Sequence, residues 1–251
     1  MLSPEAWHHR YQQQAGWTAV LRSHLFDQIG LGKGGSTLEV GCGTGAVTAD
    51  LARRYPVSSF GIDWNHDFLR LAADQDPLTR YACADAHVLP FADTVFDAVL
   101  AHMFFLWIAE PENVLAEILR TLRPGGWVLA LAEPDYGGRN RFPLKTGEIS
   151  RPPARAPPRQ GAFPRRGREM ASFFMKAGLT RVECGVMGGQ WRSAEALDGL
   201  EEEWRVLRAD LEGFVPAAEL ARFYAADKRA RQAGERILYV PTWYAIGQKP
   251  G

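Results

Sequence analysis

The sequence predicts a doubly wound α/β domain built on a parallel sheet. Short apolar segments alternate with helical segments between residues 37 and 132, which is the pattern of right-handed β-α-β crossovers. The strand segments are apolar throughout, as expected for strands that are covered on both faces of a sheet. A glycine-rich turn also joins the first strand to the helix that follows it.

The elements follow one another in a regular order. From residue 3 to residue 31 apolar side chains recur at helical spacing, after Ser3 and Pro4, which suit an N-cap and the first turn of a helix. Strands are then expected at residues 37–40, 57–62, 81–84, 96–101 and 127–132. Helices are expected between them, at residues 45–55, 65–73 and 111–122. A helix at 169–177, a strand at 181–187 and a strand-like run at 237–246 follow.

Two stretches interrupt the alternation. Residues 139–168 hold nine arginines or lysines against Glu148 alone, with six prolines that exclude a regular helix. Basic runs also occur in proteins that bind RNA or acidic partners, but here no aromatic residues alternate with the arginines. We therefore expect a solvated loop at 139–168, and a helical insertion at 190–236.

The composition limits the partners of the chain. It has 29 basic and 29 acidic residues, so it has no general attraction to nucleic acid or to an anionic membrane. Cys42, Cys83 and Cys184 lie far apart in apolar runs, which is typical of buried thiols in a reducing compartment. No apolar run approaches the ~20 residues that span a bilayer. We expect a cytoplasmic protein with no metal site; the composition does not predict its oligomeric state.

The most informative segment is the string LEVGCGTG at residues 38–45. Gly41, Gly43 and Gly45 allow a tight turn and a close approach of the backbone to a ligand, and the next helix directs its free N–H groups at the same place. The nicotinamide fingerprint has its third glycine three positions after the second, whereas here the interval is two. The spacing therefore disfavours a nicotinamide dinucleotide.

Two carboxylates follow the next strands. Asp63 ends the second strand, where a carboxylate can accept hydrogen bonds from ribose hydroxyls. Asp85 follows the third strand, where it can accept from the amino group of adenine. Together with the glycine loop, these positions predict a ligand that contains adenosine.

Five strings in this order, LEVGCGTG, GID, ADAHVLPF, FDAVLAHMFFLWI and LRPGGWVLAL, resemble class I S-adenosylmethionine-dependent methyltransferases, in particular the group that includes the quinone-biosynthesis C-methyltransferases. The resemblance implies S-adenosyl-L-methionine as cofactor and a seven-stranded, mostly parallel sheet with an antiparallel last strand. It divides the chain into an N-terminal helical lid (1–35), a cofactor-binding core (36–189), a helical insertion over the acceptor site (190–236) and a final core strand (237–251).

The resemblance also implies roles for individual residues. The three glycines of the loop would hold the methionine part of the cofactor, Asp63 would hold the ribose, and Trp64, Asp85 and Ala86 would contact the adenine. His102 would lie near the sulfonium and the acceptor, and is the candidate catalytic residue. The cofactor-binding residues expected on this basis are Glu39, Gly41, Gly43, Thr44, Gly45, Asp63, Trp64, Asp85, Ala86 and His102.

Methyl transfer from a sulfonium depends mainly on alignment of donor and acceptor, and needs a base only if the acceptor loses a proton. The acids after the fifth strand, Glu133 and Asp135, are expected to have structural roles in their loop. Aromatic residues suit a small hydrophobic or planar acceptor. They are Trp7, Tyr11, Trp17, Phe104, Phe105, Trp107, Trp191 and Trp204. Two alternatives stay open: an RNA or protein methyltransferase that uses residues 139–168, and a protein that binds the cofactor without catalysis.

Overall fold

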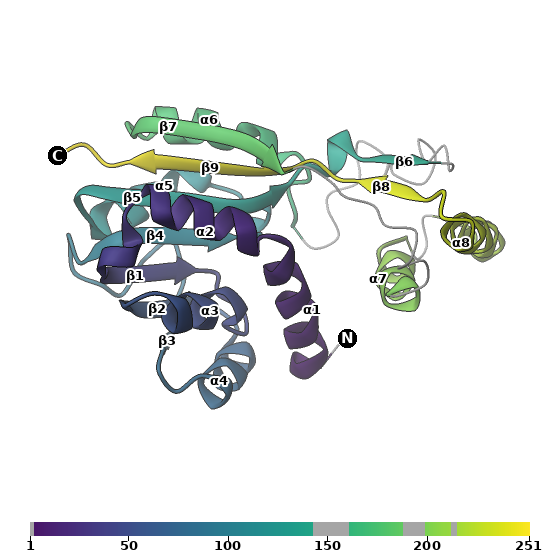
Figure 1. Ribbon diagram of the computed structural model, residues 1–251, viewed down its shortest axis with the longest axis horizontal. Helices are drawn as coiled ribbons and strands as arrows, with labels where there is room; N and C mark the ends of the chain where they lie inside the picture. Colours follow the sequence, from purple (N-terminus) through teal and green to yellow (C-terminus); the bar gives the residue numbers. More distant parts are fainter. Residues whose placement is uncertain (1–2, 143–160, 188–198, 212–214) are drawn as a thin grey trace.

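The computed structural model describes residues 3–142, 161–187, 199–211 and 215–251, and its core is one seven-stranded sheet (Figure 1). The strand order is β3-β2-β1-β4-β5-β9-β7. These strands are β1 (Gly35–Val40), β2 (Val57–Asp63), β3 (Arg80–Cys83), β4 (Phe96–His102), β5 (Leu122–Pro134), β7 (Thr180–Met187) and β9 (Thr242–Gln248). Strands β1 to β5 pair in parallel, and β9 runs antiparallel to both β5 and β7. The predicted fold class is therefore confirmed.

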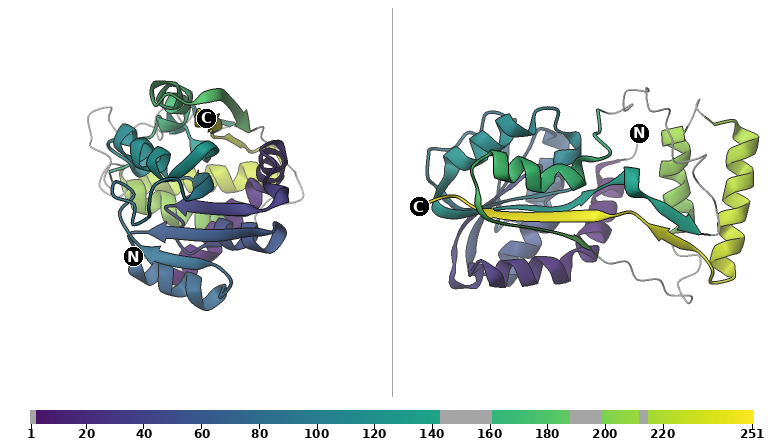
Figure 2. Two further views of the ribbon diagram at one scale, coloured as in Figure 1. Left: turned by 90° about the vertical axis from the view of Figure 1, so that its left-hand side faces the viewer. Right: turned by 90° about the horizontal axis from the view of Figure 1, so that it is seen from above.

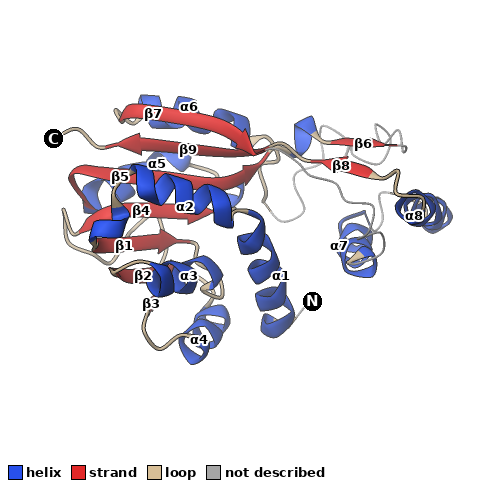
Figure 3. Ribbon diagram, viewed as in Figure 1, coloured by secondary structure: helices blue, strands red, loops and turns tan. Residues whose placement is uncertain are grey.

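Helices cover both faces of the sheet (Figure 3). One face carries α2 (Ala19–Gln28), α3 (Ala46–Arg54) and α4 (His66–Gln75), and the other carries α5 (Pro111–Thr121) and α6 (Arg166–Lys176). Successive residues of β5 belong to two hydrophobic cores, one on each face of the sheet. Leu129 lies in the core that contains Leu25 and Phe26 of α2, whereas Val128 lies in the core that contains residues of α5 and α6. The alternation explains why the strand is apolar along its whole length.

The N-terminal segment forms two helices where the sequence predicts one. The first, α1 (Pro4–Trp17), ends at Thr18, and α2 begins at the next residue. Within α1 only Ala15 is buried, whereas α2 buries Leu25 and Phe26. Helix α2 is therefore anchored in the core, and α1 extends along the edge toward which the arrowheads of β1 and β5 point (Figure 1).

The structure corrects two predictions about the second half of the chain. The run at 237–246 is two strands, β8 (Ile237–Tyr239) and β9, separated at Pro241, which has no N–H to donate to a ladder. Strand β8 pairs with β6 (Asn140–Phe142), which lies at the start of the predicted loop 139–168. Helix α6 begins at Arg166 rather than at residue 169. The middle of the predicted loop, 143–160, lies outside the described residues.

Helices α7 (Leu200–Leu211) and α8 (Ala217–Gln232) correspond to the predicted insertion at 190–236. They lie beyond the two-stranded arm of β6 and β8, at the opposite end of the molecule from the C-terminus (Figure 2). The indole N–H of Trp204, in α7, donates to Asp227 of α8 over 2.8 Å, and Trp204 is fully buried. Trp204 therefore packs the two helices together and does not offer an aromatic surface to an acceptor.

The cysteines are free, but they are not all buried as predicted. Cys42 is buried, Cys184 is partly buried, and Cys83 is exposed because it ends the edge strand β3. Among the described residues, no three or more His, Cys, Asp or Glu side chains are grouped so that they could hold a metal ion. Of the helices in the described ranges, none is long and apolar enough to cross a membrane.

Candidate cofactor-binding site

The glycine loop after β1 has a backbone that only glycine adopts readily. Gly41, Gly43 and Gly45 have φ angles of 68°, 54° and 77°, in the left-handed region that side chains with a Cβ disfavour. A Cβ atom on Gly43 would lie 2.9 Å from a ring carbon of Tyr11, and one on Gly41 would overlap the ring of Phe104. All three positions therefore require glycine, because the side chains of Phe104, Tyr11 and Tyr81 pack where a Cβ would stand.

Asp63, at the end of β2, fixes this loop in place. One carboxylate oxygen accepts the N–H of Gly43 and the other accepts the N–H of Asn65, each over 2.8 Å. The side chain of Asn65 then caps α4 by accepting two backbone N–H groups. Burial raises the pKa of Asp63, and the backbone donors oppose that shift. The same carboxylate thus joins the turns that follow two neighbouring strands.

Glu39 lies beneath the loop rather than at its surface. It is 3% exposed, and its carboxyl group accepts a hydrogen bond from the hydroxyl of Thr48 in α3. Burial raises its pKa to about 8. The bond explains how α3 is held against β1, and a contact between Glu39 and a cofactor stays a prediction.

The residues expected near adenine lie at the ends of β2 and β3. Trp64 is 83% exposed, whereas Ala86 is buried in the core. Asp85 is exposed. Its carboxylate accepts the backbone N–H of His87 and pairs with the imidazole of His87 over 2.7 Å. These bonds lower the pKa of Asp85. Their contacts with a cofactor stay predictions.

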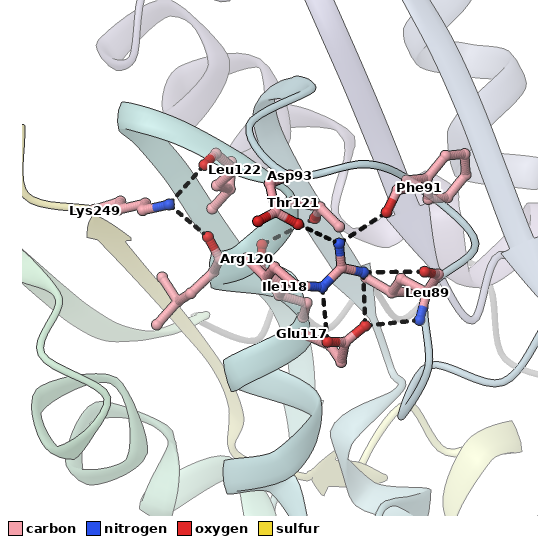
Figure 4. Close-up of polar contacts among 10 residues, drawn as sticks. Leu89, Phe91, Asp93, Glu117, Ile118, Arg120, Thr121, Leu122 and Lys249 are labelled. Atoms are coloured by element: carbon pink, nitrogen blue, oxygen red, sulfur yellow. Dashed lines mark hydrogen bonds and ion pairs between the residues drawn. The ribbon is translucent and has the colours of Figure 1, made fainter.

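Helix α5, on the other face of the sheet, holds the loop that carries Asp85 (Figure 4). Arg120 donates to the carbonyl groups of Leu89 and Phe91 over 3.0 and 2.8 Å. Glu117 accepts the N–H of Leu89 over 2.9 Å. The position of the loop after β3 is therefore set by two charged side chains that the sequence reasoning did not single out.

His102, at the end of β4, is bonded to the break between α1 and α2. Its Nε2 atom shares a hydrogen bond of 3.0 Å with the hydroxyl of Thr18. Arg22 donates to the same hydroxyl and to the carbonyl of Ala15, and forms an ion pair of 2.7 Å with Asp50. Burial lowers the pKa of His102 to about 3, and the charge of Arg22 acts in the same direction. The imidazole is therefore neutral at physiological pH.

The sequence reasoning missed Thr18, Arg22 and Asp50. A threonine within a run of helical spacing was the available signal, since β-branched and hydroxyl-bearing residues are weak helix formers. Arg22, Asp50 and His102 belong to α2, α3 and β4, so periodicity along the chain does not indicate that these side chains meet.

Helix α1 lies against the glycine loop. The Nδ1 atom of His8 and the hydroxyl of Thr44 share a hydrogen bond of 2.9 Å. The ring of Tyr11 lies beside Gly43, and burial together with the negative charge of Asp63 raises the pKa of Tyr11 to about 12. The first helix is thus in contact with the residues expected to bind the cofactor.

A cavity of about 240 Å³ lies behind the loop, between α1 and α2 on one side and α3 and α4 on the other. Of the residues expected to bind the cofactor, only Thr44 and Gly45 line it. It therefore flanks the glycine loop on the helical side, away from the ends of β2 and β3.

Of the basic residues that follow residue 160, Arg165 and Arg168 are exposed as predicted, whereas Arg166 is buried. Arg166 is 7% exposed and donates to the carbonyl of Ile108 over 2.6 Å. Arg168 pairs with the buried Asp135 over 2.5 Å. Asp135 also accepts the N–H of Gly137, which agrees with its expected structural role.

Comparisons with known proteins agree with this geometry. Residues 38–130 match the model of a family described as a methyltransferase domain. A 37.1 kDa uncharacterized protein in transposon TN4556 of Streptomyces fradiae is 28% identical over 85% of this chain and 64% of its own length. The phosphatidylethanolamine N-methyltransferase of Cereibacter sphaeroides is 34% identical over 46% of this chain and 58% of its own length. The demethylmenaquinone methyltransferase of Renibacterium salmoninarum is 31% identical over 49% of this chain and 52% of its own length.

Solved structures share the fold. The 4+2 cyclase SpnF superposes with a TM-score of 0.56 at 22% identity, over 90% of this chain and 80% of that one. Phosphoethanolamine N-methyltransferase 2 of Haemonchus contortus has a TM-score of 0.54 at 18% identity, over 87% and 49%. The matches to the three sequence relatives span 64%, 58% and 52% of their lengths. Over residues 38–130 the chain is therefore similar to S-adenosylmethionine-dependent methyltransferases, and its seven-stranded sheet has the fold of its methyltransferase neighbours.

Proposed function

We propose that this protein binds S-adenosylmethionine and transfers its methyl group to a small acceptor. The observation that carries the proposal is the left-handed backbone at Gly41, Gly43 and Gly45, which leads directly into the N-terminus of α3. Asp63, which already accepts the N–H of Gly43, fixes the shape of this cradle. A site of this kind suits a ligand that approaches the backbone closely.

The residues fit the parts of the cofactor one by one. The glycine loop would hold the methionine part, with Thr44 beside it, and Asp63 would accept hydrogen bonds from the ribose. Trp64 and Asp85 are exposed at the ends of β2 and β3, where the adenine would lie. The bound cofactor supplies a methyl group on a positively charged sulfur, and aromatic rings attract such a charge.

The N-terminal helices would form the predicted lid. Tyr11 and His8, both in α1, contact the loop at Gly43 and Thr44. Within α1 only Ala15 is buried, and Tyr11 also packs edge to face on Phe68 of α4. A lid held in this way would exclude water from the cofactor, which favours transfer to the acceptor over loss to solvent.

A hydrophobic or planar acceptor suits the remaining surface. Trp107 and Tyr136, after β4 and β5, are 47% and 44% exposed. The acids nearby already have partners: Glu133 accepts backbone N–H groups and Asp135 pairs with Arg168. The chemically different substrates in the names of the relatives do not select one acceptor. Apolar rings beside paired charges favour an uncharged molecule.

His102 stays the candidate catalytic residue, in a limited role. With a pKa of about 3 it is neutral and a weak base, so we expect it to orient α1 or the acceptor through hydrogen bonds rather than to remove a proton. Alignment alone can supply about 7–11 kcal/mol of a reaction barrier. The described end of the basic segment does not favour RNA as acceptor, because Arg166 and Arg168 are engaged within the protein.

The first test is titration calorimetry of the protein with S-adenosylhomocysteine, with NAD as the control. Micromolar binding of S-adenosylhomocysteine with no binding of NAD supports the proposed cofactor. If neither ligand binds, the proposal is refuted. Asp63→Ala should weaken binding by about 1–3 kcal/mol through lost charge-assisted hydrogen bonds.

Methyl transfer is then tested separately, because a shared fold does not fix a reaction. Incubation with radiolabelled S-adenosylmethionine and a panel of phenols, quinols, phospholipids and RNA would identify the acceptor class. Labelling of RNA alone would refute the small-molecule acceptor. Binding without transfer to any acceptor would favour a protein that only binds the cofactor.

A further inference from the structure

The carboxylate of Glu133 receives three consecutive backbone N–H groups. One oxygen accepts from Phe104 and Phe105 over 2.9 and 3.1 Å, and the other accepts from Leu106 over 3.2 Å. The side chain is fully buried at the end of β5. A buried carboxylate is strongly unfavourable without such donors, and in return it organises the turn that supplies them. The turn at 104–106 is therefore built around this acid.

The backbone on both sides of the contact is in an unusual conformation. Met103 and Ala132 have φ angles of 53° and 60°, in the left-handed region that non-glycine residues rarely adopt. The pairing of β5 with β9 also shifts its register between Ala130 and Glu133. Strain of this kind persists where surrounding contacts fix it, and it concentrates at functional sites.

A second set of contacts holds the turn from the opposite side. The N–H of Phe163 donates to the carbonyl of Leu106 over 2.5 Å, and Arg166 donates to the carbonyl of Ile108. The guanidinium of Arg166 lies over the rings of Phe163 and Phe173, at 4.4 and 5.2 Å. The turn is thus fixed between the end of β5 and the beginning of α6.

The turn carries Phe104 onto the glycine loop, where its ring occupies the space that a side chain at Gly41 would need. We propose that Glu133 is a positioning residue for cofactor binding, which fixes the turn at 104–106 so that Phe104 packs against the glycine loop at Gly41, where the cofactor would lie. Trp107 ends the 3-10 helix Phe105–Trp107, which begins in this turn, so Glu133 also positions a ring that is offered to the acceptor. This inference rests on the proposed cofactor.

The test compares Glu133→Gln with a matched control. Glutamine keeps the size of the side chain but places an amide N–H₂ group where one oxygen accepts, so the turn is released. Asp227→Asn is the control, because Asp227 is another fully buried acid, bonded to Trp204 in the separate α7–α8 pair. Both proteins are measured by thermal unfolding, by calorimetry with S-adenosylhomocysteine, and by hydrogen exchange of the amides at 104–106 without ligand.

We expect Glu133→Gln to weaken binding of S-adenosylhomocysteine at least tenfold and to speed exchange at 104–106. Asp227→Asn should lower the melting temperature without changing either quantity. Glu133→Asp, which keeps the charge, should restore part of the affinity. Phe104→Ala leaves the carboxylate in place, and should weaken binding even if Glu133→Gln does not fold.

These results distinguish a failure of the positioning role of Glu133 from a failure of the proposed cofactor. Unchanged affinity in a folded Glu133→Gln protein, with tight binding by the wild type, overturns the role of Glu133 and leaves the cofactor intact. Full affinity in Phe104→Ala overturns the role of the ring in the same way. A wild-type protein that does not bind S-adenosylhomocysteine overturns the proposed cofactor and the positioning role together.

Discussion

The Nε2 atom of His102 lies 3.0 Å from the hydroxyl of Thr18, so the end of β4 is bonded to the break between α1 and α2. Arg22 bonds the same hydroxyl and continues the connection to Asp50 in α3. Since α1 itself contacts the glycine loop through His8, the acceptor end of the site and the predicted lid share one group of polar side chains.

Removal of the Thr18 hydroxyl tests this connection. Thr18→Val should lower the free energy of unfolding by about 1–3 kcal/mol, because His102 and the buried Arg22 each lose a partner. Urea denaturation measures the change. Thr180→Val, at an exposed position of β7, is the control and should stay within about 0.5 kcal/mol of the wild type. Equal stability of the two variants would show that the bond to His102 contributes nothing.

The low pKa of His102 predicts a dependence of stability on acid. The folded protein does not bind a proton at His102 until about pH 3, whereas the unfolded chain binds one below its ordinary value of 6.5. Stability is therefore lost as the pH falls from 6.5 toward 3. His102→Asn should lose less stability than the wild type between pH 6.5 and 5, measured by chemical denaturation. A difference that does not vary with pH would contradict the shift.

Glu39 predicts the opposite dependence. Its pKa is raised from 4.5 to about 8 in the folded protein, so the folded state keeps a proton that the unfolded chain releases. This contribution is present below about pH 4.5 and is lost as the pH rises toward 8, with a limiting slope of about 1.4 kcal/mol per pH unit. In Glu39→Gln the loss between pH 5.5 and 7.5 should be smaller than in the wild type. Parallel curves for the two proteins would refute a protonated Glu39.

Two glycines separate backbone strain from crowding at the loop. Gly43 and Gly30 have φ angles of 54° and 75°, but a Cβ on Gly43 would press on Tyr11 whereas one on Gly30 would meet nothing within 4 Å. Gly30→Ala should cost about 1 kcal/mol of stability, and Gly43→Ala should cost more, because the ring of Tyr11 must also shift. Only Gly43→Ala should weaken binding of S-adenosylhomocysteine, by tenfold or more in calorimetry. Equal affinities would place the ligand away from the loop.

The sheet and the glycine loop could be predicted from the sequence because their signals are local. Apolar runs mark β1 to β5, and the glycine spacing requires a particular backbone whatever surrounds it. The break at Thr18 was not predictable from periodicity, since its bond to His102 connects distant parts of the chain. The pairing of β6 with β8 is non-local in the same way, although Pro241 was a signal that the last run would divide.

The candidate site could likewise be predicted where its signals are local, but not where it depends on contacts between distant parts of the chain. Candidate residues at the ends of strands could be named, because the carboxyl ends of parallel strands meet at one edge of the sheet. The ring of Tyr11 beside Gly43 and the three N–H groups at Glu133 depend on side-chain packing between elements. No spacing along the chain indicates those contacts.

The strand order has a consequence for how such a protein could diversify. Strands β1, β2 and β3, which carry the glycine loop, Asp63 and Asp85, form one half of the sheet, and the chain's two long additions enter after β5 and β7, in the other half. Apart from Phe163 and Arg166, which hold the turn at 104–106, those additions could therefore change in sequence without altering the strands that carry the cofactor residues. Selection could replace the substrate-facing segments as modules, and a new specificity would not require a new way to hold the methyl donor.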